Sequence, residues 1–137
     1  MDREEIKTIL PHREPMLLLD SAERIDATHA KASYRVRGDE FFLQGHFPGN
    51  PIVPGVIQCE IMAQASCILF AGELGNEVLP LYTGLDKVRF KDSIHPGDVI
   101  DIEVRVKEVR KPFYFMTGQL RVDNRLCMKG DFSFTIA

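Results

Sequence analysis

Two titratable side chains, those of His46 and Glu60, belong to the most constrained stretch of the sequence. His46 lies in a loop dense in Gly and Pro, residue types that together fix an irregular backbone. Glu60 lies in the apolar run that follows this loop. A histidine titrates near neutrality, at about pH 6.5, and burial raises the pKa of a carboxyl group. One group could therefore accept a proton while the other donates one, which is the pattern of an acid–base pair.

The apolar run predicts a helix from Val56 to Leu74. Pro54 is tolerated in a first turn, and no Pro interrupts the run. At about 100° per residue the run is apolar nearly all round, which indicates a buried helix. Glu60 falls on an apolar side of it, so we expect burial to raise its pKa and to favour the protonated acid. The residues that can end this helix are Gly72, Gly75 and Asn76.

Each of the two residues also has a purely structural interpretation. A single Glu in a helix is most often solvated, and a single His in a loop is most often a hydrogen-bonded polar group. Chemistry is favoured by the combination of a rigid loop around His46 with a carboxyl group on the apolar side of the next helix. The residues alone leave both interpretations open.

Composition and charge narrow the class of protein. A chain of 137 residues is expected to form one domain, residues 1–137, with a core of its own. A net charge of −3 does not supply the basic face that nucleic-acid binding requires. The predicted helix is too polar for a membrane span, and the first residues lack a signal-sequence pattern, which favours a cytoplasmic protein. Without CxxC spacing the cysteines indicate buried thiols rather than disulfides or metal ligands, and they are Cys59, Cys67 and Cys127.

The rest of the chain predicts one short helix and several strands. Residues 2–10 carry apolar side chains at helical spacing before Pro11. Alternating or apolar runs predict strands at residues 16–20, 29–37, 79–90, 99–109, 113–122 and 126–136. Asp123 and Asn124 indicate a hairpin turn between the last two strands. One long helix before several antiparallel strands predicts the α+β class.

Residues 45–56 read Gly-His-Phe-Pro-Gly-Asn-Pro-Ile-Val-Pro-Gly-Val, and they are followed by Glu60 and by Ala63-Gln64-Ala65. With this motif the sequence resembles the β-hydroxyacyl-acyl-carrier-protein dehydratases of the FabZ type. The likeness extends, in order, over essentially the whole chain. It includes Leu-Pro-His-Arg at residues 10–13, Pro-Met-Leu-Leu-Leu-Asp at 15–20, Gly-Leu-Asp-Lys-Val-Arg-Phe-Lys at 84–91, Pro-Gly-Asp at 96–98 and Val-Asp at 122–123.

The resemblance implies a hotdog fold, in which one curved sheet wraps a long helix. It also implies dehydration of a (3R)-hydroxyacyl thioester to the trans-2-enoyl thioester in fatty acid biosynthesis. His46 would take the proton next to the thioester carbonyl, and Glu60 would protonate the departing hydroxyl. The backbone amides of Gly55 and Val56 would bind the thioester oxygen. No cofactor or metal is implied, and His12 is expected to pack structurally without a chemical role.

The resemblance further implies two kinds of partner. The substrate arrives on the phosphopantetheine arm of an acidic acyl carrier protein, and the carrier would meet basic residues around the site. The chain would pair with a second copy, the dimers gathering in threes, with His and Glu of one site coming from different subunits. The sequence supports pairing through Met62 and Leu69, which interrupt the polar side of the helix, and through an exposed edge strand. The candidate carrier contacts are Lys87, Arg89, Lys91, Arg110 and Lys111.

Three functions remain in competition. A carrier-linked dehydratase is favoured because both His46 and Glu60 are present in the motif. A hotdog thioesterase would instead use a carboxylate to activate water, and an acyl-thioester-binding subunit would have no catalysis of its own. Glu rather than Asp at position 60 favours dehydration without isomerisation of the double bond. Asp92 stands where relatives often carry a basic residue, and Asn124 stands where they often carry Gly.

Overall fold

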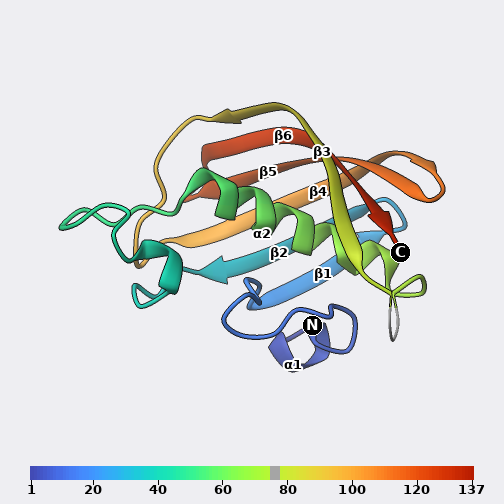
Figure 1. The fold of residues 1–137 in the computed structure, drawn as a ribbon, viewed down its shortest axis with the longest axis horizontal. Coiled ribbons are helices and arrows are strands. Elements are labelled where there is room, and N and C mark those ends of the chain that lie inside the picture. Colours follow the sequence, from blue (N-terminus) through green and yellow to red (C-terminus); the bar gives the residue numbers. More distant parts are fainter. Residues whose placement is uncertain (75–77) are drawn as a thin grey trace.

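The computed structural model describes residues 1–74 and 78–137. In this part of the chain one antiparallel sheet of six strands curves around the helix α2, which spans Gly55–Cys67 (Figure 1). The strands lie in the order β1-β2-β4-β5-β6-β3, so β1 and β3 form the edges. Their bounds are β1 Ser21–Asp26, β2 His29–Arg35, β3 Pro80–Phe90, β4 Val99–Arg110, β5 Phe113–Val122 and β6 Arg125–Ile136.

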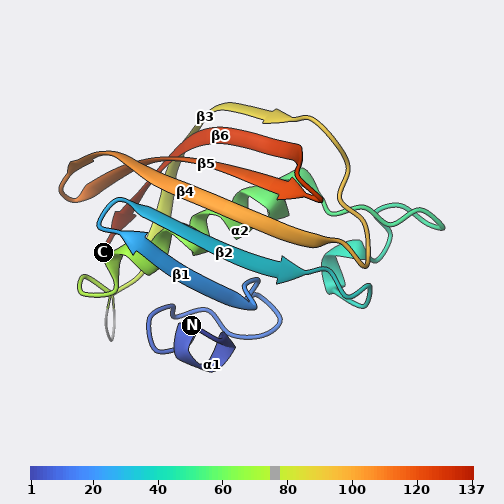
Figure 2. The ribbon, with the colours of Figure 1, turned by 180° about the vertical axis from the view of Figure 1, so that it is seen from behind.

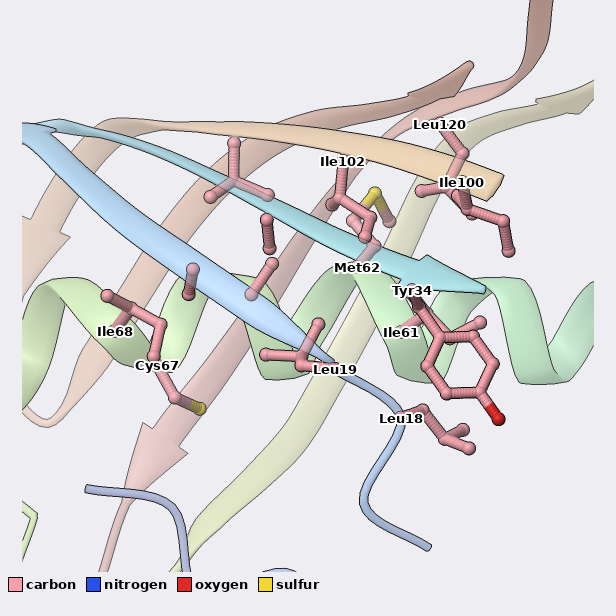
Figure 3. Close-up of a cluster of buried hydrophobic side chains, with 14 of the residues drawn as sticks. Leu18, Leu19, Tyr34, Ile61, Met62, Cys67, Ile68, Ile100, Ile102 and Leu120 are labelled. Carbon is pink, nitrogen blue, oxygen red and sulfur yellow. The ribbon is translucent and has the colours of Figure 1, made fainter. Parts of the chain in front are cut away.

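The core lies between α2 and the concave face of the sheet. Alternating residues of β4 and β5 point inward, as the period of two in their sequence predicts (Figure 3). Met62 of α2 packs directly on β5 at Gly118, where an added Cβ would lie 2.7 Å from the Met62 sulfur. A small residue at position 118 is therefore what lets the helix approach the sheet. Figure 2 shows the opposite face of the sheet, turned away from α2.

The helix is buried on most sides, as predicted, but its polar side was misread. Met62 and Leu69 are 0% and 5% exposed in the single chain, so they do not need a partner subunit to cover them. Gln58 and Ser66 on the same side are also buried. Each donates a hydrogen bond to a nearby carbonyl group, which offsets the cost of burying a polar side chain. Met62 and Leu69 therefore give no support to the expected partner subunit, and that expectation has to rest on other features of the chain.

The five strands predicted after residue 28 are confirmed within a few residues of their ends. Asp123 and Asn124 have positive φ angles of 48° and 66°, which is the backbone of the expected two-residue hairpin turn. The 11-residue edge strand β3 is exposed along nearly its whole length. Its neighbour in the sheet is β6, with Phe90 opposite Met128.

Two element predictions are wrong, and one strand was not predicted. Residues 16–20 form no strand, although Leu17, Leu18 and Leu19 are fully buried. Strand β1 was not predicted, because only Ala22 of its residues is buried and the sequence does not alternate. The long helix ends at Cys67 and continues as the 3₁₀ turn η2, Ile68–Phe70, which is shorter than the predicted span to Leu74. The proposed stop signals Gly75 and Asn76 lie outside the described residues.

The N-terminal helix is also shorter than expected. It is α1, Arg3–Ile6, and Asp2 caps it by accepting from the amide of Glu5, whose side chain accepts in return from the amide of Asp2. A second short 3₁₀ turn, η1, spans Phe41–Leu43 just before the His46 loop. Among the described residues no helix has the length and apolar character needed to cross a membrane.

Candidate active site

His46 lies in the loop between η1 and α2. Gly45 and Gly49 bend this loop with φ angles of 83° and 73°, a region that favours glycine. The Nδ1 atom of His46 lies 3.1 Å from the carbonyl oxygen of Ile52. Because a carbonyl can only accept, Nδ1 carries the proton and Nε2 keeps a free lone pair. The ring also stacks on Phe47, with centroids 4.4 Å apart. The loop therefore fixes His46 with a basic nitrogen available.

The first turn of α2 borders the same space. A cleft of about 670 Å³ is lined by His46, by Gly55 and Val56, and by Phe90 of β3. The amides of Gly55 and Val56 lie in the first turn of α2, where no intrahelical carbonyl can accept a hydrogen bond from them. They are therefore free to bind an anionic oxygen. An added Cβ at Gly55 would lie 2.8 Å from the Phe90 ring, which explains the glycine. Val56 is 77% exposed, so the side of α2 that carries Glu60 is open at this end.

Glu60 lies one turn further along α2 and is partly buried. Its Oε2 atom accepts a hydrogen bond of 2.9 Å from Nε2 of Gln64, and the same oxygen lies 3.3 Å from Nε2 of His12. Burial raises the pKa of Glu60, but the donor groups of His12 and Gln64 and the positive charge that His12 can carry outweigh burial, so the net pKa is lowered. The expectation of a raised pKa is wrong for the single chain, because it gave most weight to the apolar neighbours and did not include His12.

His12 is the residue that the sequence interpretation missed. It follows α1 in a segment whose neighbours Pro11 and Arg13 are exposed, whereas His12 turns inward to Glu60. The available signal was its place inside residues 10–20, which carry part of the family resemblance. Sequence spacing could not place it beside Glu60, since the two residues are brought together only by tertiary packing.

His46 and Glu60 line different cavities of the single chain. Glu60 lies in a cavity of about 250 Å³ with His12, Tyr82 and Cys67, and this cavity shares no lining residue with the cleft at His46. Burial raises the pKa of the Cys67 thiol to about 12 and also raises the pKa of Tyr82, so both groups stay neutral. The structure thus places His46 beside the helix amides and Glu60 beside His12, in two cavities that have no lining residue in common.

Comparisons with known proteins identify the family of this chain. The family model of the FabA-like domain matches residues 10–131. The 3-hydroxyacyl-[acyl-carrier-protein] dehydratase FabZ of Natranaerobius thermophilus is 39% identical over 137 residues, covering 98% of this chain and 96% of that protein. The protein of the same name from Clostridium perfringens is 40% identical and covers 99% of each chain. The chain belongs to the FabZ-type dehydratases.

Solved structures show the fold of this FabZ-type chain. The dehydratase heterocomplex ApeI:P from Xenorhabdus doucetiae superposes with a TM-score of 0.83 at 22% identity, covering 96% of this chain and 90% of that chain. A hypothetical thioesterase from Streptococcus pneumoniae, solved with coenzyme A, superposes with a TM-score of 0.66 at 13% identity, covering 85% and 84%. At these identities the likeness concerns the fold alone. It confirms the predicted α+β hotdog fold.

The five basic candidates of the FabZ-type chain are divided between two ends of the sheet. Lys91 lines the cleft at His46, and Lys87 and Arg89 precede it on β3. Arg110 and Lys111 lie at the turn between β4 and β5, beyond the other end of β3, as the pairing of the strands requires. Asp92 forms an ion pair with Arg125, which reduces its effect on the neighbouring basic charges. Among the described residues no group of three or more His, Cys, Asp or Glu is gathered as a metal site would require.

Proposed function

We propose that this chain dehydrates (3R)-hydroxyacyl-acyl-carrier protein to the trans-2-enoyl thioester in fatty acid biosynthesis, and that His46 is the base. The observation that carries the proposal is the contact between Nδ1 of His46 and the carbonyl of Ile52. This contact holds the imidazole ring in place and leaves Nε2 of His46 able to take the proton from the carbon next to the thioester carbonyl. The family and the composition both favour the cytoplasm as the compartment.

Glu60 is the acid in this proposal. Elimination requires a proton for the departing hydroxyl, and a carboxyl group held in a partly buried site can supply it. In the single chain the donors lower the pKa of Glu60, while burial opposes them. A substrate acyl chain or a second subunit over Glu60 would add burial and shift the balance toward the protonated acid.

The N-terminus of α2 stabilises the enolate that forms when the proton leaves. The amides of Gly55 and Val56 have no intrahelical acceptor, and the positive end of the helix dipole lies at the same place. A thioester oxygen bound there would gain charge in the transition state, where preorganised donors are most effective. Gly55, which has no Cβ, lies against the Phe90 ring, and a larger residue at this position would crowd the space beside these amides.

A second copy of the chain completes the site in this proposal. His46 and Glu60 line separate cavities, and the exposed edge of β3 carries Leu85 and Phe90, each 53% exposed. Pairing of two β3 edges would satisfy the free backbone groups and cover these apolar side chains. The dimers would gather in threes, as the family resemblance implies. The carrier protein would meet the basic residues near the His46 cleft, Lys87, Arg89 and Lys91.

Mass spectrometry of a (3R)-hydroxyacyl-carrier protein incubated with the enzyme tests the reaction. The proposal expects a loss of about 18 Da, the mass of the water eliminated, and expects that His46→Ala and Glu60→Gln both abolish it. Release of the free acid would assign a thioesterase instead. A substrate that binds but stays unchanged would assign a binding subunit.

A further inference from the structure

We infer that His12 is a positioning residue of this site, which holds one oxygen of the Glu60 carboxyl group so that the other oxygen faces the substrate. This inference rests on the proposed function, since it assigns Glu60 the role of acid. It concerns a residue outside the motif at positions 45–65.

The backbone around His12 is fixed from both sides. The Arg13 side chain donates to the carbonyl oxygens of His12, at 2.7 Å, and of Leu10, at 3.0 Å. After His12 the chain is clamped by Gln64 of α2, which donates to the carbonyl of Met16 at 2.7 Å and accepts from the amide of Leu18 at 2.8 Å. The imidazole therefore sits on a backbone that can move little relative to α2.

His12 and Gln64 both meet the same atom of Glu60. Nε2 of Gln64 lies 2.9 Å and Nε2 of His12 lies 3.3 Å from Oε2. No hydrogen bond from residues 1–74 or 78–137 reaches Oε1 of Glu60. The Gln64 donor and the His12 ring nitrogen lie on the same oxygen and restrict the rotation of the carboxyl group, and the other oxygen is left for the hydroxyl of the substrate or a bridging water.

The remaining groups around Glu60 are neutral. Cys67 of the same helix and Tyr82 of β3 line the cavity, and burial raises the pKa of both. His12 is thus the one residue able to carry positive charge among the described residues that line this cavity. Its Nδ1 atom is buried and has no partner among the described residues, so the polar contact of this ring with the protein is made through Nε2.

Steady-state kinetics on the full chain with (3R)-hydroxyacyl-carrier protein test the inference. In His12→Leu we expect kcat to fall about 10- to 100-fold, because a misoriented acid loses its alignment with the leaving group. KM should stay within about twofold, because His12 does not touch the substrate. His29→Leu is the matched control. His29 is also largely buried, and its Nε2 lies 3.5 Å from a carboxylate, but that carboxylate belongs to Glu103.

Two amide variants keep the test decisive if His12→Leu does not fold. His12→Gln can place an amide N–H near the position of Nε2, whereas His12→Asn places it near Nδ1. We expect His12→Gln to retain several-fold more kcat than His12→Asn. Equal kcat in these two variants, or an equal loss in His12→Leu and His29→Leu, would overturn the inference.

Infrared titration of the Glu60 carboxyl band, identified by its absence in Glu60→Gln, gives a second reading. Removal of the His12 donor should raise the pKa of Glu60, and His29→Leu should leave it unchanged. A Glu60 band that does not move in His12→Leu would show that His12 only packs. If Glu60→Gln itself keeps full activity, the assignment of Glu60 as the acid is wrong. If Glu60→Gln is inactive but His12→Leu has normal activity, only the inference about His12 is wrong.

Discussion

The ionisation of Glu60 is decided by a few neighbouring atoms rather than by the general character of its helix. Burial alone would raise its pKa, but the donor groups of His12 and Gln64 lower it. At the same scale, one carbonyl oxygen, that of Ile52, determines which ring nitrogen of His46 keeps a free lone pair. Gln64 and Ile52 are near neighbours of Glu60 and His46 in the sequence, whereas His12 is brought to Glu60 only by tertiary packing.

The substitution Gly55→Ala should damage activity more than stability. The new Cβ would lie 2.8 Å from the Phe90 ring, which must move, and that ring lines the cleft at His46. Because Phe90 is 53% exposed in the single chain, its ring can turn outward without opening the core of that chain, and we expect the free energy of unfolding to change by less than about 1 kcal/mol. We expect kcat/KM to fall at least about tenfold, because Phe90 would be displaced from the wall of the cleft and the backbone amide of residue 55 would be crowded.

Gly72→Ala is the control for this substitution. Gly72 has an ordinary φ angle and no heavy atom within 4 Å of the added Cβ. Both kcat/KM and the thermal unfolding midpoint should match the wild type. A Gly55→Ala enzyme as active as Gly72→Ala would contradict a role for this position in the site.

At the scale of elements, Gln64 joins the N-terminal segment to α2. Its amide group bonds the backbone of Met16 and Leu18 as well as the carboxyl group of Glu60. These bonds replace the strand pairing that residues 16–20 lack. Gln64 thus holds the N-terminal segment, which carries His12, against the helix that carries Glu60.

Gln64→Leu should destabilise the fold by about 1–3 kcal/mol, because the buried amide of Leu18 loses its acceptor. It should also raise the pKa of Glu60 by removing a donor. Gln58→Leu is the control on the same helix, since Gln58 is equally buried but makes one hydrogen bond, to the carbonyl of Val53. Chemical denaturation would measure the free energy of unfolding of both variants. An equal loss in the two would argue against a special role for the bonds from Gln64 to Met16 and Leu18.

Acid should weaken the hold on the N-terminal segment. The pKa of Glu14 is lowered to about 2 by its own backbone amide and by the side chains of Arg3 and Lys7. A lowered carboxyl pKa stabilises the fold above the unfolded value, near 4.5, and this stability is lost as the pH falls toward about 2. The difference in unfolding midpoint between wild type and Glu14→Gln should therefore be present near neutrality and shrink between about pH 4.5 and pH 2.

Glu4→Gln serves as the comparison for this pH dependence. Glu4 meets the same Lys7 at 3.4 Å but is 81% exposed, so its ion pair should contribute little. A difference for Glu14→Gln that stays constant with pH would contradict the assignment.

The sequence could predict those elements whose own residues alternate or are uniformly apolar. Strands β4, β5 and β6, the hairpin turn at Asp123 and the buried helix α2 all follow from local pattern. Strand β1 could not be predicted, because it has one buried residue and is stabilised by pairing with β2. The position of His46 in a rigid loop was predictable from Gly and Pro, whereas the contact between His12 and Glu60 depends on packing between segments far apart in the chain.

At the scale of the whole molecule, the proposed mechanism divides the site of a single chain into two halves. One half contains His46 and the amides of Gly55 and Val56, and the other contains Glu60 with His12. The long edge strand β3 borders both cavities, through Phe90 at one and Tyr82 at the other. A two-fold contact at this edge would bring the His46 half of one chain to the Glu60 half of the next.

Mixing of inactive subunits tests whether the site is shared. If it is, a dimer of His46→Ala with Glu60→Gln contains one site with both groups intact and one with neither. Free reassortment of equal amounts should then restore about a quarter of the wild-type activity, since half of the dimers are mixed and each has one working site. His46→Ala mixed with the double variant His46→Ala/Glu60→Gln should restore none, because no site regains its base. If the first mixture also stays inactive although mass spectrometry shows mixed dimers, the two groups must act within one chain, and closure of the loop at His46 toward Glu60 would be required instead.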